Sequence, residues 1–272
     1  MIIKIDKVLE KLEDEIDIIK SKLIKTPKMI SISDNLTSAT RSYLKSQKKI
    51  ANKYGIDFSV IETDDIVKDL NKYNNDKNID GIFVSRPLKN KNYQEIDIAR
   101  LLNPNKDIEG LSVYNMGEMV YENEYFVPCT AESAIKILEN CMDLEGKNIV
   151  VIGRSINVGK AAAIMLERKN RSATVTITNS RTKNLKELTM KADAVIVAIG
   201  KAEYLTKDFI KEGTYIIDVG INFKNGKLFG DVSKDLYDKN YYITPVPGGV
   251  GTITSTILMR NVFRAAIKNI KQ

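Results

Sequence analysis

The chain has 272 residues, 43% of them hydrophobic and 28% charged, a balance typical of a globular protein with room for two domains of about 100–150 residues each. It contains no histidine, which excludes Ser/His/Asp and Cys/His catalysis and zinc sites with histidine ligands. With 42 Lys and Arg against 35 Asp and Glu, the net charge is +7, which suits a polyanionic small molecule, a nucleic acid or simply a solvated lysine-rich surface.

The two cysteines, Cys129 and Cys141, form no CxxC pair and are too few for a metal quartet. We therefore expect free thiols, no metal site and a cytoplasmic protein. The longest apolar run, from Ala194 to Gly200, is far shorter than the roughly 18–20 residues that cross a bilayer, so we expect no membrane segment. No basic stripe is interleaved with aromatic residues, so we expect no nucleic-acid partner.

The first half of the chain alternates helical and strand-like patterns. The predicted helices are residues 7–23, 37–54 and 64–75. The predicted strands are residues 28–33, 58–61 and 81–84. Gly55 suits a left-handed helix end. Strands that alternate with helices predict a parallel sheet covered on both faces.

The alternation restarts after Pro128. The predicted helices are near residues 131–141 and over residues 158–168. The predicted strands are residues 148–152, 173–177, 194–198 and 215–219, a Rossmann-type series. A Pro/Gly-rich stretch from Thr244 to Gly251 then leads into a last helix.

The turn after the strand at 148–152 contains two glycines, Gly153 and Gly159, before a predicted helix. Glycines let the backbone approach an anion, and a helix amino terminus adds partial positive charge, so one interpretation is a phosphate-binding turn. The spacing is not GxGxxG, so a plain strand–turn–helix is the other interpretation.

The end of the next strand indicates which dinucleotide would bind. NAD-selective sites usually place an acidic residue there to hold the ribose hydroxyls, but residues 179–183 contain none. Ser180, Arg181 and the earlier Arg154 are groups suited to a 2′-phosphate. The pattern favours NADP over NAD.

A second candidate segment is the loop from Pro245 to Thr252, which has two prolines and three glycines. Its composition predicts a rigid loop with exposed backbone amides. An interdomain connection is the alternative.

Six segments occur in order along the chain: Pro128–Thr130, Gly153–Ser155 with Val158–Gly159, Ser180–Leu185, Ile217–Asn222, Gly230–Val232 and Thr244–Gly251. Taken together, they give a resemblance to the methylenetetrahydrofolate dehydrogenase/cyclohydrolase family over nearly the whole chain. It implies an α/β protein of two domains that forms a homodimer. The first is an amino-terminal α/β folate domain, residues 1–128, completed by the carboxy-terminal helix within 252–272; the second, residues 129–251, is a Rossmann-type NADP domain.

The resemblance also implies a reaction and a set of site residues. Family members oxidise methylenetetrahydrofolate to methenyltetrahydrofolate by hydride transfer, and many then hydrolyse the product to formyltetrahydrofolate. The implied cofactor-binding residues are Gly153, Arg154, Ser155, Val158, Gly159, Ser180, Arg181 and Ile221. The implied substrate-binding residues are Tyr43, Arg86, Glu109, Pro247, Gly248 and Gly249. The implied catalytic positions are Tyr43, Gln47, Ser85 and Glu109.

Several of these positions depart from the family pattern. The family has a lysine four residues after its tyrosine, whereas this chain has Gln47 after Tyr43. The glutamine that holds that lysine is replaced by Ser85, the next leucine by Arg86, and the aspartate that grips the pterin by Glu109. For Tyr43 two interpretations are open: its ring stacks on the substrate, or it is a core residue.

These departures threaten one activity more than the other. Hydride transfer depends mainly on cofactor and substrate being held together, whereas ring opening needs a water activated by proton transfer. A glutamine amide has no proton that titrates in the useful range. We therefore expect an NADP-dependent dehydrogenase whose cyclohydrolase step is weak or lost. The alternatives are a catalytically silent binding homologue and a full bifunctional enzyme in which Arg86, otherwise a surface arginine, compensates.

Overall fold

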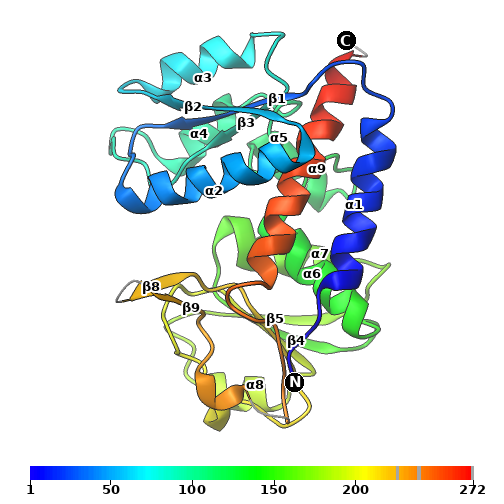
Figure 1. Ribbon diagram of the computed structural model, residues 1–272. Coiled ribbons are helices and arrows are strands. Elements are labelled where there is room, and N and C mark those ends of the chain that lie inside the picture. Colours follow the sequence, from blue (N-terminus) through cyan, green and yellow to red (C-terminus); the bar gives the residue numbers. More distant parts are fainter. Residues whose placement is uncertain (225–226, 238–239, 271–272) are drawn as a thin grey trace. The chain divides into compact units, whose positions relative to one another are not determined.

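Two separate parallel sheets organise the chain (Figure 1). The computed structural model describes residues 1–224, 227–237 and 240–270. Contacts divide the chain into a three-stranded unit, Lys11–Val127 with Ser255–Gln272, and a five-stranded unit, Met1–Glu10 with Pro128–Thr254. The domain boundaries given above, 1–128 with 252–272 and 129–251, stay a prediction.

The three-stranded unit has a parallel sheet in the order β2-β1-β3. Its strands are β1 (Lys28–Ser33), β2 (Asp57–Glu62) and β3 (Gly81–Val84). Helices α3 (Ile66–Asn74) and α4 (Glu95–Leu101) pack on one face, where Ile30, Ile82 and Leu70 are buried together. Figure 1 shows α2 (Ser38–Tyr54) on the other side of this sheet.

Local signals explain where α2 begins and ends. Thr37 caps its start, because its Oγ1 accepts a hydrogen bond from the backbone N–H of Thr40 at 3.1 Å. Gly55 ends it with φ +78°, the left-handed cap predicted from the sequence.

Three further helices contribute to this unit: α1 (Asp6–Lys20), α5 (Val113–Val120) and α9 (Val250–Ile270). Most of α9 belongs to it, and Nδ2 of Asn261 donates a hydrogen bond to the carbonyl oxygen of Ile108 at 2.9 Å. The carboxy-terminal helix therefore completes the amino-terminal α/β domain, as expected.

The five-stranded unit has a parallel sheet in the order β10-β7-β6-β4-β5. Its strands are β4 (Asn148–Ile152), β5 (Thr174–Thr178), β6 (Ala194–Val197), β7 (Tyr215–Asp218) and β10 (Tyr242–Ile243). The backbone N–H of Ile3 donates to the carbonyl oxygen of Ile243 at 2.8 Å, so the first residues extend this sheet beside β10.

Helices pack against this second sheet, and the order of its strands defines a topological switch point. The helices are α6 (Cys129–Cys141), α7 (Ala161–Glu167) and α8 (Leu185–Met190), with a π-helical turn at Ile156–Lys160 before α7. The chain leaves β4 for β5 on one side and later returns to β6 on the other side. The carboxyl ends of β4 and β6 therefore form the topological switch point, where such sheets bind ligands.

The fold class predicted from the sequence is confirmed, and so are the strands at 28–33, 81–84 and 148–152. The helix expected over 158–168 instead starts as the π-helical turn at Ile156. The sequence patterns did not indicate α4, α5, α8, β10 or the hairpin of β8 (Asn222–Lys224) and β9 (Lys227–Phe229). None of the helices within the described ranges is both long and apolar enough to span a membrane.

Candidate functional site

The first candidate site lies at the carboxyl edge of the five-stranded sheet, just after Ile152. Gly153 has φ +125°, and a Cβ there would lie 2.3 Å from the carbonyl oxygen of Ala198. A Cβ on Gly159 would lie 2.1 Å from the carbonyl oxygen of Gly153. Both positions therefore require glycine, and Val158 between them is buried. This is the close backbone approach that suits a phosphate at the start of a helix.

Four exposed polar residues lie in this turn and in the turn after β5: Arg154, Ser155, Ser180 and Arg181. The side chain of Asn179 shapes the second turn, because its Oδ1 accepts a hydrogen bond from the backbone N–H of Arg181 at 3.0 Å. Residues 179–186 include no acid. These groups fit a 2′-phosphorylated dinucleotide better than NAD, which needs a carboxylate for its ribose hydroxyls.

Two loops at the same edge carry the other predicted residues of this unit. Ile221, after β7, is 60% exposed. In the loop between β10 and α9, Pro247 and Gly248 are exposed, whereas Gly249 is buried. A Cβ on Gly249 would lie 2.4 Å from the carbonyl oxygen of Pro245, so this loop is tightly folded on itself.

A buried carboxylate at the end of β7 fixes the backbone near these loops. Asp218 accepts hydrogen bonds from the backbone N–H groups of Gly220 and Asp231, each at 2.9 Å, and of Val232 at 3.0 Å. Burial raises the pKa of Asp218 to about 6, although these hydrogen bonds favour the charged form. Burial together with the charge of Asp218 raises the pKa of Tyr237 to about 12.

In the three-stranded unit, α2 carries Tyr43 and Gln47 one helical turn apart. Tyr43 is 46% exposed, whereas Gln47 is 3% exposed. Nε2 of Gln47 donates to Oγ of Ser255 on α9 at 3.0 Å, and its Oε1 has no hydrogen-bond partner among the described residues. Gln47, which the sequence resemblance aligns with the family lysine, is therefore a buried amide whose acceptor oxygen no described residue satisfies.

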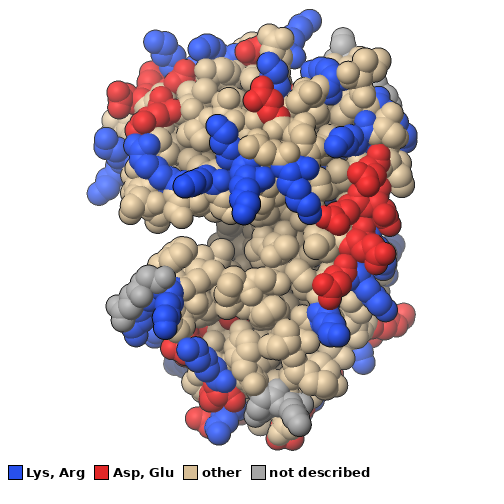
Figure 2. All heavy atoms as spheres, in the orientation of Figure 1, with Lys and Arg blue, Asp and Glu red and all other residues tan. Residues whose placement is uncertain are grey.

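The exposed face of α2 is basic, and Figure 2 shows Lys and Arg side chains gathered along this helix. Lys45, Lys48 and Lys49 are exposed. At about 100° per residue, Lys45 and Lys49 lie roughly 160° around the helix from Gln47, and Lys48 lies roughly 100° away. These ammonium groups therefore do not take the buried position of Gln47.

Ser85 and Arg86 follow β3, but their side chains bond to different parts of the unit. Oγ of the buried Ser85 lies 2.7 Å from Oγ of Ser31 on β1. Nε of Arg86 donates to Oε2 of Glu95 at 2.5 Å, and its Nη1 donates to the carbonyl oxygen of Val84 at 2.8 Å. Ser85 is thus tied to the sheet, whereas the amide of Gln47 is tied to α9.

Arg86 and Glu109, two separate departures from the family pattern, form an ion pair. Nη1 of Arg86 lies 3.4 Å from Oε2 of Glu109, and the two side chains are 29% and 25% exposed. Burial raises the pKa of Glu109 to about 7 against the opposing charge of Arg86. Burial lowers the pKa of Arg86, but the charges of Glu109 and Glu95 outweigh it and raise that pKa overall. Arg86 is therefore a cation held by two carboxylates.

The segment that carries Glu109 is fixed from two directions. Asp107 is fully buried, and its Oδ2 accepts a hydrogen bond from the backbone N–H of Ser112 at 2.7 Å. The carbonyl oxygen of Ile108 accepts from Asn261 on α9. Glu109 thus projects from a rigid backbone.

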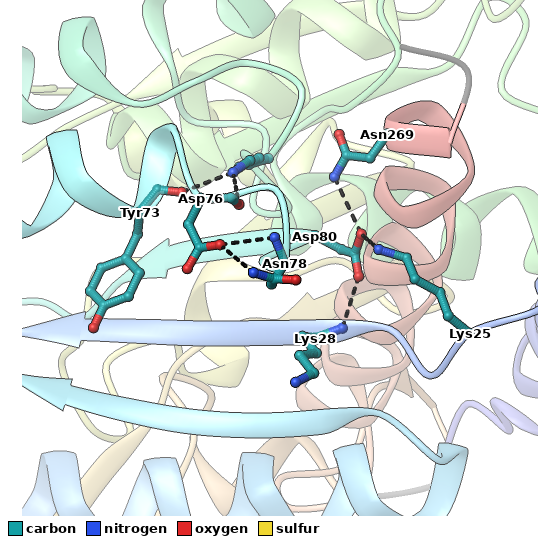
Figure 3. A network of polar contacts seen from close by, with 8 residues as sticks. Lys25, Lys28, Tyr73, Asp76, Asn78, Asp80 and Asn269 are labelled. Atoms are coloured by element: carbon teal, nitrogen blue, oxygen red, sulfur yellow. Dashed lines mark hydrogen bonds and ion pairs between the residues drawn. The ribbon is translucent and has the colours of Figure 1, made fainter.

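A polar network around Asp80 joins β1, the start of β3 and α9 (Figure 3). The fully buried Asp80 accepts hydrogen bonds from three donors: Nζ of Lys25 at 2.8 Å, the backbone N–H of Lys28 at 3.0 Å and Nδ2 of Asn269 at 3.4 Å. Nζ of the buried Lys106 donates to the carbonyl oxygens of Tyr73 and Asp76 at 2.9 and 2.7 Å. Burial lowers the pKa of Lys106.

Sequence reasoning did not identify two residues that hold the predicted ones. Glu95 binds Arg86, and Ser255 binds Gln47 from 208 positions away. Neither belongs to a motif, and no spacing connects either residue to its partner.

The fold and the glycine-lined turn define a two-domain α/β protein with a dinucleotide-binding unit. Residues 128–270 match "Tetrahydrofolate dehydrogenase/cyclohydrolase, NAD(P)-binding domain", and residues 4–109 match the catalytic domain of the same description. The chain therefore belongs to the tetrahydrofolate dehydrogenase/cyclohydrolase family, as its sequence motifs predict.

The chain matches individual relatives over nearly the whole length of both partners. The chain is 52% identical over 266 residues to the "Bifunctional protein FolD" of Petrotoga mobilis, covering 98% of this chain and 97% of that protein. It is similar to the solved bifunctional 5,10-methylenetetrahydrofolate dehydrogenase/cyclohydrolase of Thermoplasma acidophilum, with a TM-score of 0.89, 30% identity and complete coverage of both chains. The Trypanosoma brucei enzyme, solved with NADP cofactor and an inhibitor, has a TM-score of 0.86 at 26% identity, covering 98% of this chain and 96% of that one.

Proposed function

We propose that this protein is an NADP-dependent methylenetetrahydrofolate dehydrogenase whose cyclohydrolase step is weak or lost. It oxidises methylenetetrahydrofolate to methenyltetrahydrofolate. The observation that carries the proposal is the buried amide of Gln47, held by Ser255 where the family has a lysine.

The residues at the carboxyl edge of β4 bind and orient the cofactor. NADP, when bound, supplies the acceptor for the hydride. The backbone around Gly153 and Gly159 receives the phosphates, because neither position has room for a Cβ. Arg181, assisted by Ser180 and Arg154, pairs with the 2′-phosphate. Binding of NADP by the Trypanosoma brucei relative supports this assignment.

The folate is held by residues with separate tasks. The exposed ring of Tyr43 stacks on the substrate's aromatic system, and the carboxylate of Glu109 accepts hydrogen bonds from the pterin ring. Arg86 keeps Glu109 in place, since it contacts that carboxylate at 3.4 Å. The sequence resemblance also assigns Pro247, Gly248 and Gly249 to substrate binding; Pro247 and Gly248 are exposed, whereas Gly249 is buried.

The hydrolytic step lacks its proton carrier. An amide neither gains nor loses a proton near neutral pH, so Gln47 orients a donor group but does not activate water. Arg86 does not compensate, because it already binds Glu95 and Glu109 and its pKa is raised. A guanidinium of raised pKa stays protonated at neutral pH, so it neither takes up nor releases a proton.

A second candidate function is the full bifunctional reaction with Glu109 as the proton carrier. A pKa of about 7 favours it, since that carboxyl exchanges protons at neutral pH. Glu109→Gln distinguishes the two, because only the second candidate makes hydrolysis depend on this carboxyl more strongly than dehydrogenation does.

We also propose a cytoplasmic homodimer. The family resemblance supports the dimer, and two cysteines with no disulfide between them support a reducing compartment. Light scattering on the purified protein tests the dimer, and a monomer mass would contradict it.

Separate assays of the two steps with wild-type protein test the proposed function. We expect hydride transfer from methylenetetrahydrofolate to NADP and slow hydrolysis of supplied methenyltetrahydrofolate. Fast hydrolysis would refute the proposal. NADP and folate binding without hydride transfer would instead identify a silent homologue.

A further inference from the structure

Asp231, which follows β9, is a fully buried carboxylate that accepts four hydrogen bonds. Its Oδ2 accepts from the backbone N–H groups of Ile199 at 2.7 Å and Gly200 at 2.9 Å. Its Oδ1 accepts from the backbone N–H of Lys201 and from Nδ2 of Asn222, both at 2.8 Å. All four partners are donors, and bonds to an ionised acceptor are stronger than neutral ones.

The backbone that Asp231 holds is one wall of the crevice at the switch point. Residues 199–201 follow β6, which pairs directly with β4. The residue before them, Ala198, is the one whose carbonyl oxygen a Cβ on Gly153 would strike. Residues 199–201 and the glycine-lined turn therefore face the same crevice, where a Rossmann-type sheet binds its dinucleotide.

Asp218 in turn holds Asp231. It accepts the backbone N–H of Asp231 itself, and the backbone N–H of Asp218 donates to Oγ1 of Thr244 at 2.8 Å. The two carboxylates pack without spare room: a Cβ on Gly220 would lie 2.3 Å from Cγ of Asp231, and one on Gly230 would lie 1.8 Å from Oδ2 of Asp218. The Ile217–Asn222 and Gly230–Val232 motifs are thus held together by the hydrogen bonds of these two carboxylates.

We propose that Asp231 is a positioning residue of the NADP site, whose carboxylate fixes residues 199–201 and, through Asn222, the segment of Ile221 before the cofactor binds. The inference rests on the proposed function, since it takes this crevice as the cofactor site. A wall that is already ordered lowers the conformational cost of binding. Removing the carboxylate therefore weakens cofactor binding, whereas none of its four hydrogen bonds goes to a proposed folate residue.

A carboxylate is required at this position because every partner donates. In Asp231→Asn the new NH₂ group faces two N–H donors, whichever way the amide turns, so two accepted hydrogen bonds are lost. The variant is nearly isosteric, which separates the loss of acceptors from a loss of volume.

The test compares Asp231→Asn with the matched control Asp193→Asn. Asp193 also accepts a backbone N–H, that of Asn148 at 2.9 Å, but at the amino edge of the same sheet. For Asp231→Asn we expect the Kd for NADP, measured by calorimetry, to rise about tenfold to a hundredfold with the Kd for folate unchanged. In the cofactor-free protein, amide hydrogen exchange at residues 199–201 should accelerate. Asp193→Asn should change neither readout, even if its Tm falls.

An unchanged Kd for NADP in folded Asp231→Asn would overturn the inference, and so would an equal loss in the control. If Asp231→Asn does not fold, Asn222→Ala removes one of the four bonds and should raise the Kd for NADP about threefold to tenfold; no change would overturn the inference. Failure of wild-type protein to bind NADP would instead refute the proposed function. Normal wild-type binding with an unaffected variant refutes only the role of Asp231.

Discussion

In the proposed NADP site, coenzyme choice depends most directly on Arg181, and Arg181→Ala measures its contribution. The side chain is exposed, and the turn that carries it is shaped by Asn179, so truncation removes the charge but leaves the backbone in place. A hydrogen bond between charged groups contributes about 1.5–3 kcal/mol. At about 1.4 kcal/mol per factor of ten, the KM for NADP should rise about tenfold to more than a hundredfold. NAD has no 2′-phosphate, so its KM should change little.

The assay is steady-state dehydrogenation with each coenzyme, supported by calorimetric Kd values. Lys186→Ala is the matched control, since it removes one exposed positive charge a few residues further along. It should leave the ratio of the two KM values unchanged. Equal losses for NADP and NAD in Arg181→Ala would refute the reasoning, because Arg181 would then not contact the extra phosphate.

Three further predictions concern charge, packing and stability. Burial raises the pKa of Glu109 to about 7, so its carboxyl ionises as pH rises from about 6 to about 8, and the KM for folate should fall over that range. Glu109→Gln should flatten this pH profile of KM. A profile that Glu109→Gln leaves unchanged would contradict the assignment. Gly159→Ala places a Cβ 2.1 Å from a backbone oxygen, so it should lower the free energy of unfolding by about 1–3 kcal/mol and abolish most NADP binding. Gly117→Ala has open space around the new Cβ, so it should raise the free energy of unfolding, measured with denaturant, by about 0.5–1 kcal/mol. Asp80→Asn should lower the free energy of unfolding by about 2–3 kcal/mol, because a fully buried acceptor loses part of its network; an unchanged midpoint would contradict this.

The raised pKa of Glu109 also has a consequence for stability. The folded protein binds more protons than the unfolded chain between the ordinary pKa of 4.5 and about 7. Stability from this group is therefore highest below that range and falls as pH rises through it. The difference between wild type and Glu109→Gln in unfolding free energy should change across these pH values.

The elements that could be predicted from the sequence are those with a strong local signal. The buried strands β1, β3 and β4 are short apolar runs, and α2 has both a threonine cap and a glycine end. The elements that were missed are short: β10 has two residues and α8 has six. Their stability comes from the sheet and helices around them, which no local pattern records.

The residues of the candidate site also fall into those that a local pattern indicates and those that only the fold brings together. Gly153 and Gly159 could be singled out because both lie in a short turn between a predicted strand and a predicted helix, and their lack of space for a Cβ gives the physical reason for glycine there. The pairing of Arg86 with Glu109 could not be found, since 23 residues separate them and only the fold brings them within 3.4 Å. The four donors around Asp231 are mostly backbone groups, which any residue supplies, so the sequence carries no trace of them.

The central claim is that a buried amide has replaced the group that handles water while hydride transfer is kept. The rate of methenyltetrahydrofolate hydrolysis, divided by the dehydrogenase rate of the same sample, tests it in wild type, Gln47→Lys and the uncharged control Gln47→Met. The account predicts a low ratio in wild type and in Gln47→Met, and a rise of about a hundredfold or more in Gln47→Lys. A wild-type ratio near one, unchanged by Gln47→Lys, would contradict it.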